Sequence, residues 1–184
     1  EASRGQPACL AACSAAATAC ARAGRWPAVL ELLCGVRRRG AALDVIAWSV
    51  AVGACERGRH WRLALELLRE MRAGAVAPNS VTYVAAMGAC AKGLDWVRSL
   101  GLFGEMKASG VEATIVVQNV AISSCEKGQQ WRRALVLLQE AFLQALVPTI
   151  FSYAAAISAC EKGYEWQQAL SLLSEAEGRR LSTN

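Results

Sequence analysis

The cysteines have the greatest chemical potential in this sequence, because thiolates bind metals, attack electrophiles and form disulfides. The chain has eight of them but no CxxC pair, and His60 is its only histidine, so the sequence predicts no metal site. There is also no nucleophile with a neighbouring base and no phosphate-binding loop. We therefore expect no catalytic residue, no cofactor and no small-molecule substrate.

Five of the eight cysteines recur every 35 residues, at Cys20, Cys55, Cys90, Cys125 and Cys160. Cys9, Cys13 and Cys34 lie outside this series. A buried free cysteine behaves as a small apolar residue. The spacing thus predicts five copies of one packing site rather than a disulfide framework, and favours a reducing compartment.

A basic residue recurs at the same interval, two residues after each of these cysteines, and could bind a polyanion. The five cations are Arg22, Arg57, Lys92, Lys127 and Lys162. Four residues before each of them stands a small residue: Thr18, Gly53, Gly88, Ser123 or Ser158. Stacked repeats would place the cations in a row. The small residues beside this row would not fill a groove, and such an arrangement suits a linear polyanion.

Two further features bear on this polyanion hypothesis. A cation near a helix C-terminus can simply complement the helix dipole, and acidic Glu56, Glu126 and Glu161 stand next to three of the cations. An apolar residue on the same predicted helix face favours a groove nonetheless; it is Ala11, Ile46, Val81, Val116 or Phe151. The net charge of +5 permits a polyanionic partner without requiring one.

These side chains must be positioned by repeated elements, since tryptophan also follows each repeated cysteine by six residues, without insertion or deletion. A fixed period of this length is typical of a solenoid, in which each unit buries its apolar face against its neighbours. We expect residues 1–9 to be the tail of a preceding repeat. The full repeats would be 10–44, 45–79, 80–114, 115–149 and 150–184.

Each repeat has the pattern of two helices. The fourth, seventh, eighth and eleventh residues are mainly apolar and form one buried stripe, which Gln118 interrupts in the fourth repeat. Glycine is expected to end the first helix, at Gly58, Gly93, Gly128 and Gly163. The second helix should begin near tryptophan. Because the tryptophans share a face with leucines, we expect wedges between helices rather than platforms for bases.

A membrane span is not expected. Residues 141–160 carry no charge, but Gln144, Pro148 and several hydroxyl residues interrupt them. The sequence starts with Glu1 and stops at a repeat boundary, which suggests a segment of a longer protein. No targeting segment is visible in it.

The pattern resembles the pentatricopeptide repeat family. The resemblance rests on the 35-residue period, the Val81-Thr82-Tyr83 opening, the Cys-x-Lys/Arg-x-Gly turn or close variants of it, the Ala-Leu-x-Leu-Leu run and Pro-Asn near a repeat boundary. It implies an all-α fold, a right-handed α-solenoid of five helix-turn-helix repeats. It also implies binding of single-stranded RNA, one base per repeat, in organelle RNA processing, stability, editing or translation.

The resemblance further implies that the fifth and last residues of each repeat read the base. These pairs are Ser14 with Asp44, Ser49 with Asn79, Val84 with Thr114, Asn119 with Thr149, and Ala154 with Asn184. The apolar second residues Ile46, Val81, Val116 and Phe151 would clamp the bases, and the five cations would contact phosphate. The first two pairs imply guanine then adenine, and the full expectation is 5′-G-A-N-Y-N-3′, where N is any base and Y a pyrimidine.

Two alternatives remain open at this stage. A helical-repeat scaffold could bind a protein or peptide segment in the same groove. The chain could also be the targeting arm of an enzyme with its catalytic domain elsewhere. The family resemblance implies a chloroplast or mitochondrial location and other RNA-processing proteins as further partners, with no membrane association.

Overall fold

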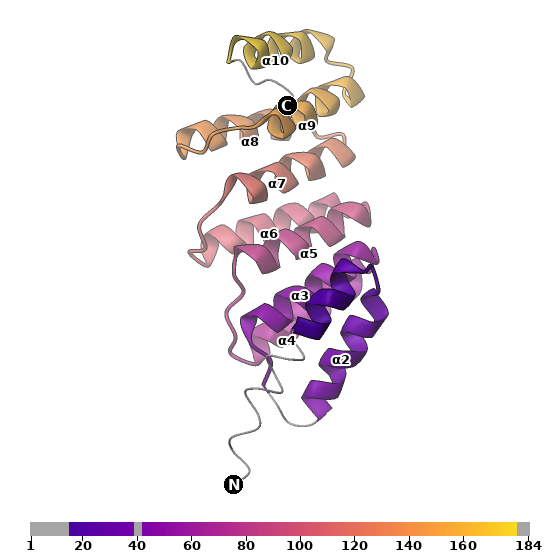
Figure 1. Cartoon of the computed structure of the whole chain (residues 1–184). Coiled ribbons are helices and arrows are strands. Elements are labelled where there is room, and N and C mark those ends of the chain that lie inside the picture. Colours follow the sequence, from indigo (N-terminus) through magenta and orange to yellow (C-terminus); the bar gives the residue numbers. More distant parts are fainter. Residues whose placement is uncertain (1–14, 39–41, 180–184) are drawn as a thin grey trace. The chain divides into compact units, whose positions relative to one another are not determined.

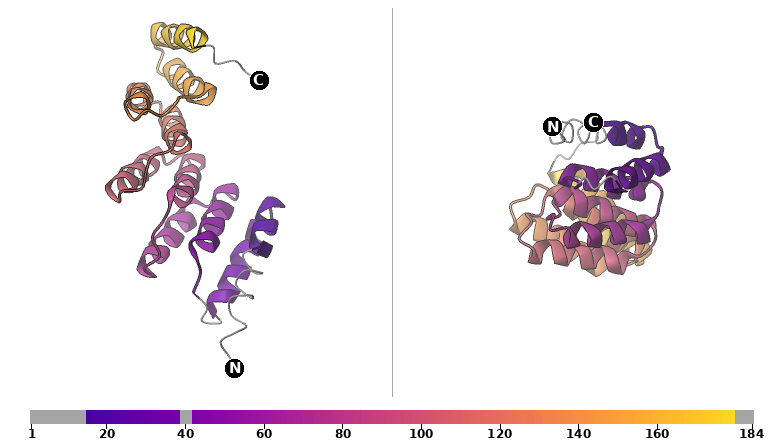
Figure 2. Two further views of the ribbon diagram at one scale, coloured as in Figure 1. Left: turned by 60° about the vertical axis from the view of Figure 1, so that its left-hand side comes forward. Right: turned by 90° about the horizontal axis from the view of Figure 1, so that it is seen from below.

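The computed structural model describes residues 15–38 and 42–179, and every regular element in these ranges is a helix (Figure 1). The expected tail at 1–9 and the start of the first repeat lie outside the described residues. The chain divides into two compact units, residues 1–93 and 94–184. Within each unit, the first helices of consecutive repeats lie side by side, α3 with α5 and α7 with α9 (Figures 1 and 2).

The helices recur at the interval of the sequence motif. After a short helix at residues 15–22, the first helices of successive repeats are α3 (Val45–Arg57), α5 (Ser80–Lys92), α7 (Ile115–Lys127) and α9 (Ile150–Lys162). The second helices are α2 (Trp26–Arg38), α4 (Trp61–Ala73), α6 (Trp96–Ala108), α8 (Trp131–Leu143) and α10 (Trp166–Gly178). The all-α, helical-repeat fold predicted from the period is therefore confirmed. A common superhelical handedness stays a prediction.

The core of each unit is the apolar stripe of its first helices. In the first unit, α3 packs against α2, α4 and α5. Its buried stripe is Trp48, Ala51, Val52 and Cys55, as the periodicity predicts. In the second unit, α7 packs against α6, α8 and α9, and α10 packs against α9. Each first helix is thus enclosed by helices on several sides, which fixes the orientation of its remaining face.

The repeated cysteines pack in this core as small apolar residues. Cys55, Cys90, Cys125 and Cys160 are free and buried, and Cys20 is half-buried. Burial raises the pKa of the Cys55 thiol to about 11, and that of the Cys125 thiol likewise to about 11. These thiols are therefore protonated at neutral pH and are neither nucleophiles nor metal ligands in this state.

Gln118 interrupts the stripe at a buried position. Its Nε2 donates to the Leu137 carbonyl at 2.7 Å, whereas its Oε1 has no hydrogen-bond partner among the described residues. Tyr83 and Tyr153 occupy the same repeat position in α5 and α9, and their hydroxyls reach Arg72 and Glu175. The fourth repeat therefore buries a polar group that is only half satisfied. None of the helices in the described part of the chain is both long and apolar enough to cross a membrane.

Glycine follows each of the first helices α3, α5, α7 and α9, as predicted. Gly58, Gly93, Gly128 and Gly163 all have negative φ, between −76° and −89°, which any residue can adopt. The left-handed residue is the next one, and it is not glycine; the four are Arg59, Leu94, Gln129 and Tyr164. The prediction that glycine ends these helices is therefore confirmed, although the glycine itself does not adopt the left-handed conformation.

A tryptophan ring lies against each of these glycines and leaves no room for a side chain. A Cβ on Gly128 would lie 2.5 Å from Cγ of Trp96, in the second helix of the preceding repeat. The same relation joins Gly58 to Trp26, Gly93 to Trp61 and Gly163 to Trp131. Tryptophan therefore acts as a wedge in four repeats. The expectation fails for Trp166, which is 66% exposed.

The Trp–Gly contact can be tested by adding one methyl group. Gly128→Ala keeps an allowed backbone but places its Cβ inside the Trp96 ring contact, so we expect a loss of about 1–3 kcal/mol in the free energy of unfolding, the usual cost of overpacking. Chemical denaturation measures this change.

Gly104→Ala in α6 is the matched control, because nothing lies within 4 Å of its Cβ. Removing a mid-helix glycine should instead stabilise the protein by about 0.5–1 kcal/mol. Equal effects of the two substitutions would show that the Trp96 ring does not restrict position 128.

Candidate functional site

The last residue of each repeat caps the first helix of the next. Asp44 Oδ1 accepts a hydrogen bond from the Ala47 backbone N–H at 2.7 Å, before α3. Asn79 Oδ1 accepts from the Thr82 backbone N–H at 3.0 Å, before α5. Such caps satisfy one of the free N–H groups of a helix start. In both residues Oδ1 is committed, so the second polar atom, Oδ2 of Asp44 or Nδ2 of Asn79, is the one that can face a ligand.

Threonine has the same place in the second unit. Thr114 Oγ1 accepts from the Val117 backbone N–H at 3.4 Å, before α7. Thr149 forms a capping box with Ser152 before α9, in which the Thr149 backbone N–H donates to Ser152 Oγ at 2.9 Å. A threonine has a single side-chain oxygen, so capping leaves it less capacity to read a base than Asp or Asn.

The fifth residues of the repeats differ in the hydrogen bonds that their side chains can make. Ser49 Oγ lies 2.8 Å from the Val45 carbonyl and 2.8 Å from Thr82 Oγ1. Asn119 Nδ2 donates to Thr149 Oγ1 at 3.3 Å, and its Oδ1 accepts from Ser152 Oγ at 2.5 Å. The candidate base-reading pairs of the second and fourth repeats therefore belong to hydrogen-bonded networks. Val84 and Ala154 have no polar side-chain atom.

The expected clamping residues are exposed although they are apolar. The exposed fractions are 64% for Ile46, 60% for Val81, 54% for Val116 and 74% for Phe151. All four are the second residue of a first helix, directly after its N-terminal residue. A repeated exposed apolar residue is costly unless it contacts something, so this position is a candidate contact for a ligand.

The basic residues at the ends of the first helices cross to the preceding repeat. Lys92 Nζ forms an ion pair with Glu56 at 2.9 Å, and Lys162 Nζ forms one with Glu126 at 2.8 Å. Arg57 donates to the Ala21 carbonyl at the end of the helix at 15–22. Arg22 and Lys127 are exposed. Carboxylates of the preceding repeat therefore compensate the charge of Lys92 and Lys162, and a continuous row of cations stays a prediction.

The small ninth residues receive those carboxylates. A Cβ on Gly88 would lie 2.7 Å from Glu56 Oε1, and Ser158 Oγ donates to Glu126 Oε1 at 3.1 Å. The expectation of an empty strip was wrong at these two junctions, because glutamate side chains of the preceding repeat lie on it. The sequence signal was the acidic residue directly before Arg57 and Lys127, namely Glu56 and Glu126.

Four other positions remain to be compared with the sequence. Ser14 and Asn184, expected to read bases, lie outside the described residues. Sequence reasoning missed Thr82 and Ser152, two buried hydroxyl residues at the third position of their repeats. A hydroxyl in an otherwise apolar helix start, 33 residues after a polar fifth residue, would have been the signal.

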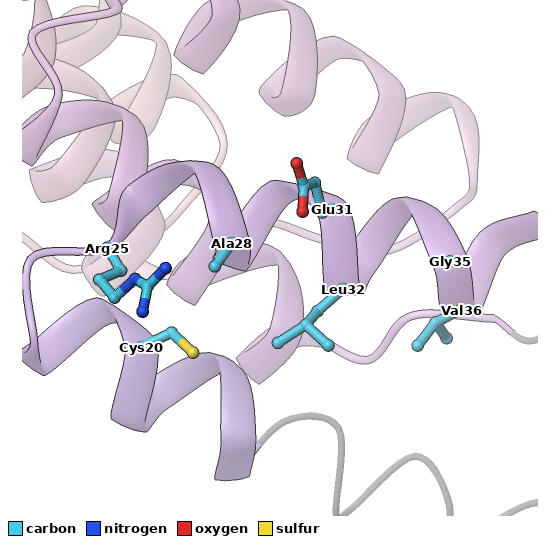
Figure 3. Close-up of a pocket in the computed structure, with 7 residues that line it drawn as sticks. All are labelled: Cys20, Arg25, Ala28, Glu31, Leu32, Gly35 and Val36. Atoms are coloured by element: carbon cyan, nitrogen blue, oxygen red, sulfur yellow. The ribbon is translucent and has the colours of Figure 1, made fainter.

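An open pocket of about 540 Å³ lies between the helix at 15–22 and α2 (Figure 3). Its lining residues are Cys20, Arg25, Ala28, Glu31, Leu32, Gly35 and Val36. None of these is a candidate base-reading, clamping or phosphate residue, so the pocket is separate from the repeated face. Within residues 15–38 and 42–179, no group of three His, Cys, Asp or Glu side chains could hold a metal ion.

Helical hairpins at a fixed interval, each with a capping polar residue, an exposed apolar residue and a cation in the same places, define an α-solenoid repeat protein. Residues 31–93 match the model of the pentatricopeptide repeat domain, and residues 81–111 match that of the PPR repeat. The chain belongs to the pentatricopeptide repeat family. A search of curated proteins found no significant match.

Solved structures of this family have a similar fold. The PPR domain of Arabidopsis thaliana protein-only RNase P 1, in complex with tRNA, superposes with a TM-score of 0.81 at 15% identity, over 96% of this chain and 93% of that one. Maize PPR10, in complex with an 18-nt psaJ RNA element, gives a TM-score of 0.78 at 26% identity. That match covers 91% of this chain but only 25% of PPR10.

The capping role of Asn79 predicts how substitutions there affect stability. Asn79→Ala removes the acceptor for the Thr82 N–H and should cost about 1 kcal/mol of unfolding free energy. Asn79→Asp keeps Oδ1 and adds a negative charge at a helix N-terminus. The free energy of unfolding should therefore stay about the same or rise slightly. Thermal or urea unfolding measures both. An equal loss in the two variants would mean that the amide nitrogen, not Oδ1, makes the structural bond.

Proposed function

We propose that this chain binds single-stranded RNA, one base per repeat, through the exposed face of its first helices. The observation that carries the proposal is that a polar residue caps the start of each of α3, α5, α7 and α9, and an exposed apolar residue follows it two positions later. The cap fixes the polar group, and the apolar residue two positions later offers a surface against which a base can stack. Two similar structures contain RNA, which supports the same assignment.

The choice of base follows from the side-chain polar atom of Asp44 or Asn79 that takes no part in the helix cap. Oδ2 of Asp44 can accept from the ring N–H of guanine, whereas Nδ2 of Asn79 can donate to the unprotonated ring nitrogen of adenine. Asn119 in the fourth repeat keeps one amide hydrogen beyond its bond to Thr149 and favours a pyrimidine. We propose the order 5′-G-A-N-Y-N-3′ from the N- to the C-terminal repeat.

The biological setting is part of the same proposal. The chain acts as the RNA-selecting part of organelle RNA processing, in a chloroplast or mitochondrion, and performs no chemistry itself. Its similarity to the PPR domain of a protein-only RNase P supports the view that such an array can be the targeting arm of an enzyme. Binding of a peptide on the same exposed apolar residues is the second candidate, since these residues suit either ligand.

Asn79→Asp tests base reading, because it exchanges a donor for an acceptor and keeps the cap. The preferred second base should change from adenine to guanine. The difference in binding free energy between the two oligonucleotides should shift by roughly 1–2 kcal/mol, about the scale of one hydrogen-bond mismatch. Fluorescence anisotropy with oligonucleotides that differ only at this base gives the four dissociation constants.

The other outcomes discriminate between the hypotheses. If the variant loses affinity equally for all four bases, Asn79 has only its capping role. If the wild-type protein binds no oligoribonucleotide but captures a peptide, the scaffold hypothesis replaces RNA binding.

Glu126→Gln tests the electrostatics of the face. The carboxylate of Glu126 pairs with Lys162, so its removal should leave that cation to a phosphate and raise RNA affinity about three- to tenfold at low salt. The slope of log K against log salt should steepen by up to about 0.7, the value for one further phosphate contact on a single strand.

Glu177→Gln in α10 is the matched control, because it changes the net charge equally on a second helix and no ion pair involves it in the described structure. If both variants strengthen binding alike, net charge alone acts, and the Lys162 position is not a phosphate contact.

A further inference from the structure

Two buried hydroxyl groups connect the residues that we assign to base reading. Thr82 and Ser152 are the third residues of the third and fifth repeats, and both are fully buried at the start of α5 and α9. Buried hydroxyls are retained when hydrogen bonds satisfy them. Their partners are side chains of the preceding repeat, so each hydroxyl acts across a repeat junction.

Thr82 joins both members of the base-reading pair of the second repeat. Its Oγ1 donates to Asn79 Oδ1 at 3.0 Å and lies 2.8 Å from Ser49 Oγ. Ser49 can donate its single hydroxyl hydrogen either to the Val45 carbonyl or to Thr82, and Thr82 accepts from it when its own hydrogen is used on Asn79. Thr82 therefore competes with the Val45 carbonyl for the hydrogen of Ser49 and also holds Asn79 Oδ1.

Ser152 has the same relation to the fourth repeat. It donates to Asn119 Oδ1 at 2.5 Å and accepts from the Thr149 backbone N–H at 2.9 Å. Because the oxygen of Asn119 is held by Ser152, its amide nitrogen lies toward Thr149 Oγ1 at 3.3 Å. In this arrangement the amide oxygen accepts from one hydroxyl and the amide nitrogen donates to another. Two junctions with different residues therefore share one geometry.

We propose that Thr82 and Ser152 are positioning residues for base selection, so that the third residue of a repeat sets how sharply the preceding repeat discriminates between bases. The inference rests on the proposed RNA binding and deepens it. Neither hydroxyl contacts RNA, because both are buried. They act by holding the donor and acceptor directions of Ser49, Asn79 and Asn119 before the base arrives, which reduces the ordering cost of each base contact.

The decisive variant is Thr82→Val, which keeps the shape of the side chain and removes the hydroxyl. Asn79 retains its cap on the backbone N–H at position 82, and Ser49 retains the Val45 carbonyl, so the fold should persist. The preference for adenine over guanine at the second base should fall about three- to tenfold, as for loss of one neutral hydrogen bond. Affinity for a sequence-random oligonucleotide should change less than twofold, and Thr82→Ser should restore the preference.

Ser152→Ala is the reciprocal control. It should weaken the pyrimidine preference at the fourth base and leave the second base unchanged, whereas Thr82→Val should do the reverse. Dissociation constants for base-substituted oligonucleotides at both positions, with thermal unfolding of each variant, form the complete set of measurements.

Each result has a distinct meaning. A selective loss at the corresponding base, rescued by Thr82→Ser, supports the positioning role. Discrimination that survives in Thr82→Val, or a uniform loss of affinity together with a lower melting temperature, overturns it and leaves RNA binding in place. A wild-type protein without base preference at either position overturns this inference and the one-base-per-repeat proposal together.

Discussion

The repeated contact between a tryptophan ring and a glycine backbone is the constraint on which the arrangement depends. The ring of Trp61 lies where a Cβ of Gly93 would otherwise stand, and Trp96 has the same relation to Gly128. Such a contact fixes the distance between consecutive hairpins, because neither a larger residue nor a smaller ring fills the same space. The register of the capping, apolar and basic residues across a junction follows from that distance. One steric rule, applied at each repeat, therefore positions the whole exposed face within each unit.

The residue between two repeats caps a helix, and in the proposed function it also reads a base. Asp44 and Asn79 each use one oxygen to cap a helix, and the geometry of the cap directs the remaining polar atom. A helix N-terminus is thereby used as a holder for a hydrogen-bonding group. This double use gives a physical reason for short side chains with two polar atoms at the junction. A threonine cap, such as Thr114, has no second polar side-chain atom left to offer a ligand.

Much of the fold could be predicted from the sequence, because helix starts, stripes and turns depend on local spacing. The tryptophan at each second-helix start and the buried cysteines follow from periodicity alone. The role of glycine could not be predicted in the same way, since Gly128 is needed for a neighbour 32 positions earlier and not for its own φ. The ion pair of Lys162 with Glu126 was also missed. Contacts between repeats require the stacking geometry, which a list of spacings does not contain.

The tryptophans also make the array accessible to optical measurement. Each of four junctions holds one indole against a peptide backbone, while Trp166 is mostly in solvent. Indole emission depends on its surroundings, so a protein that retained a single one of these rings would report the separation of one chosen junction. An array whose units interact only with their neighbours can lose its ends before its middle. The repeated ring thus allows the order in which hairpins detach to be followed by fluorescence, without any added label.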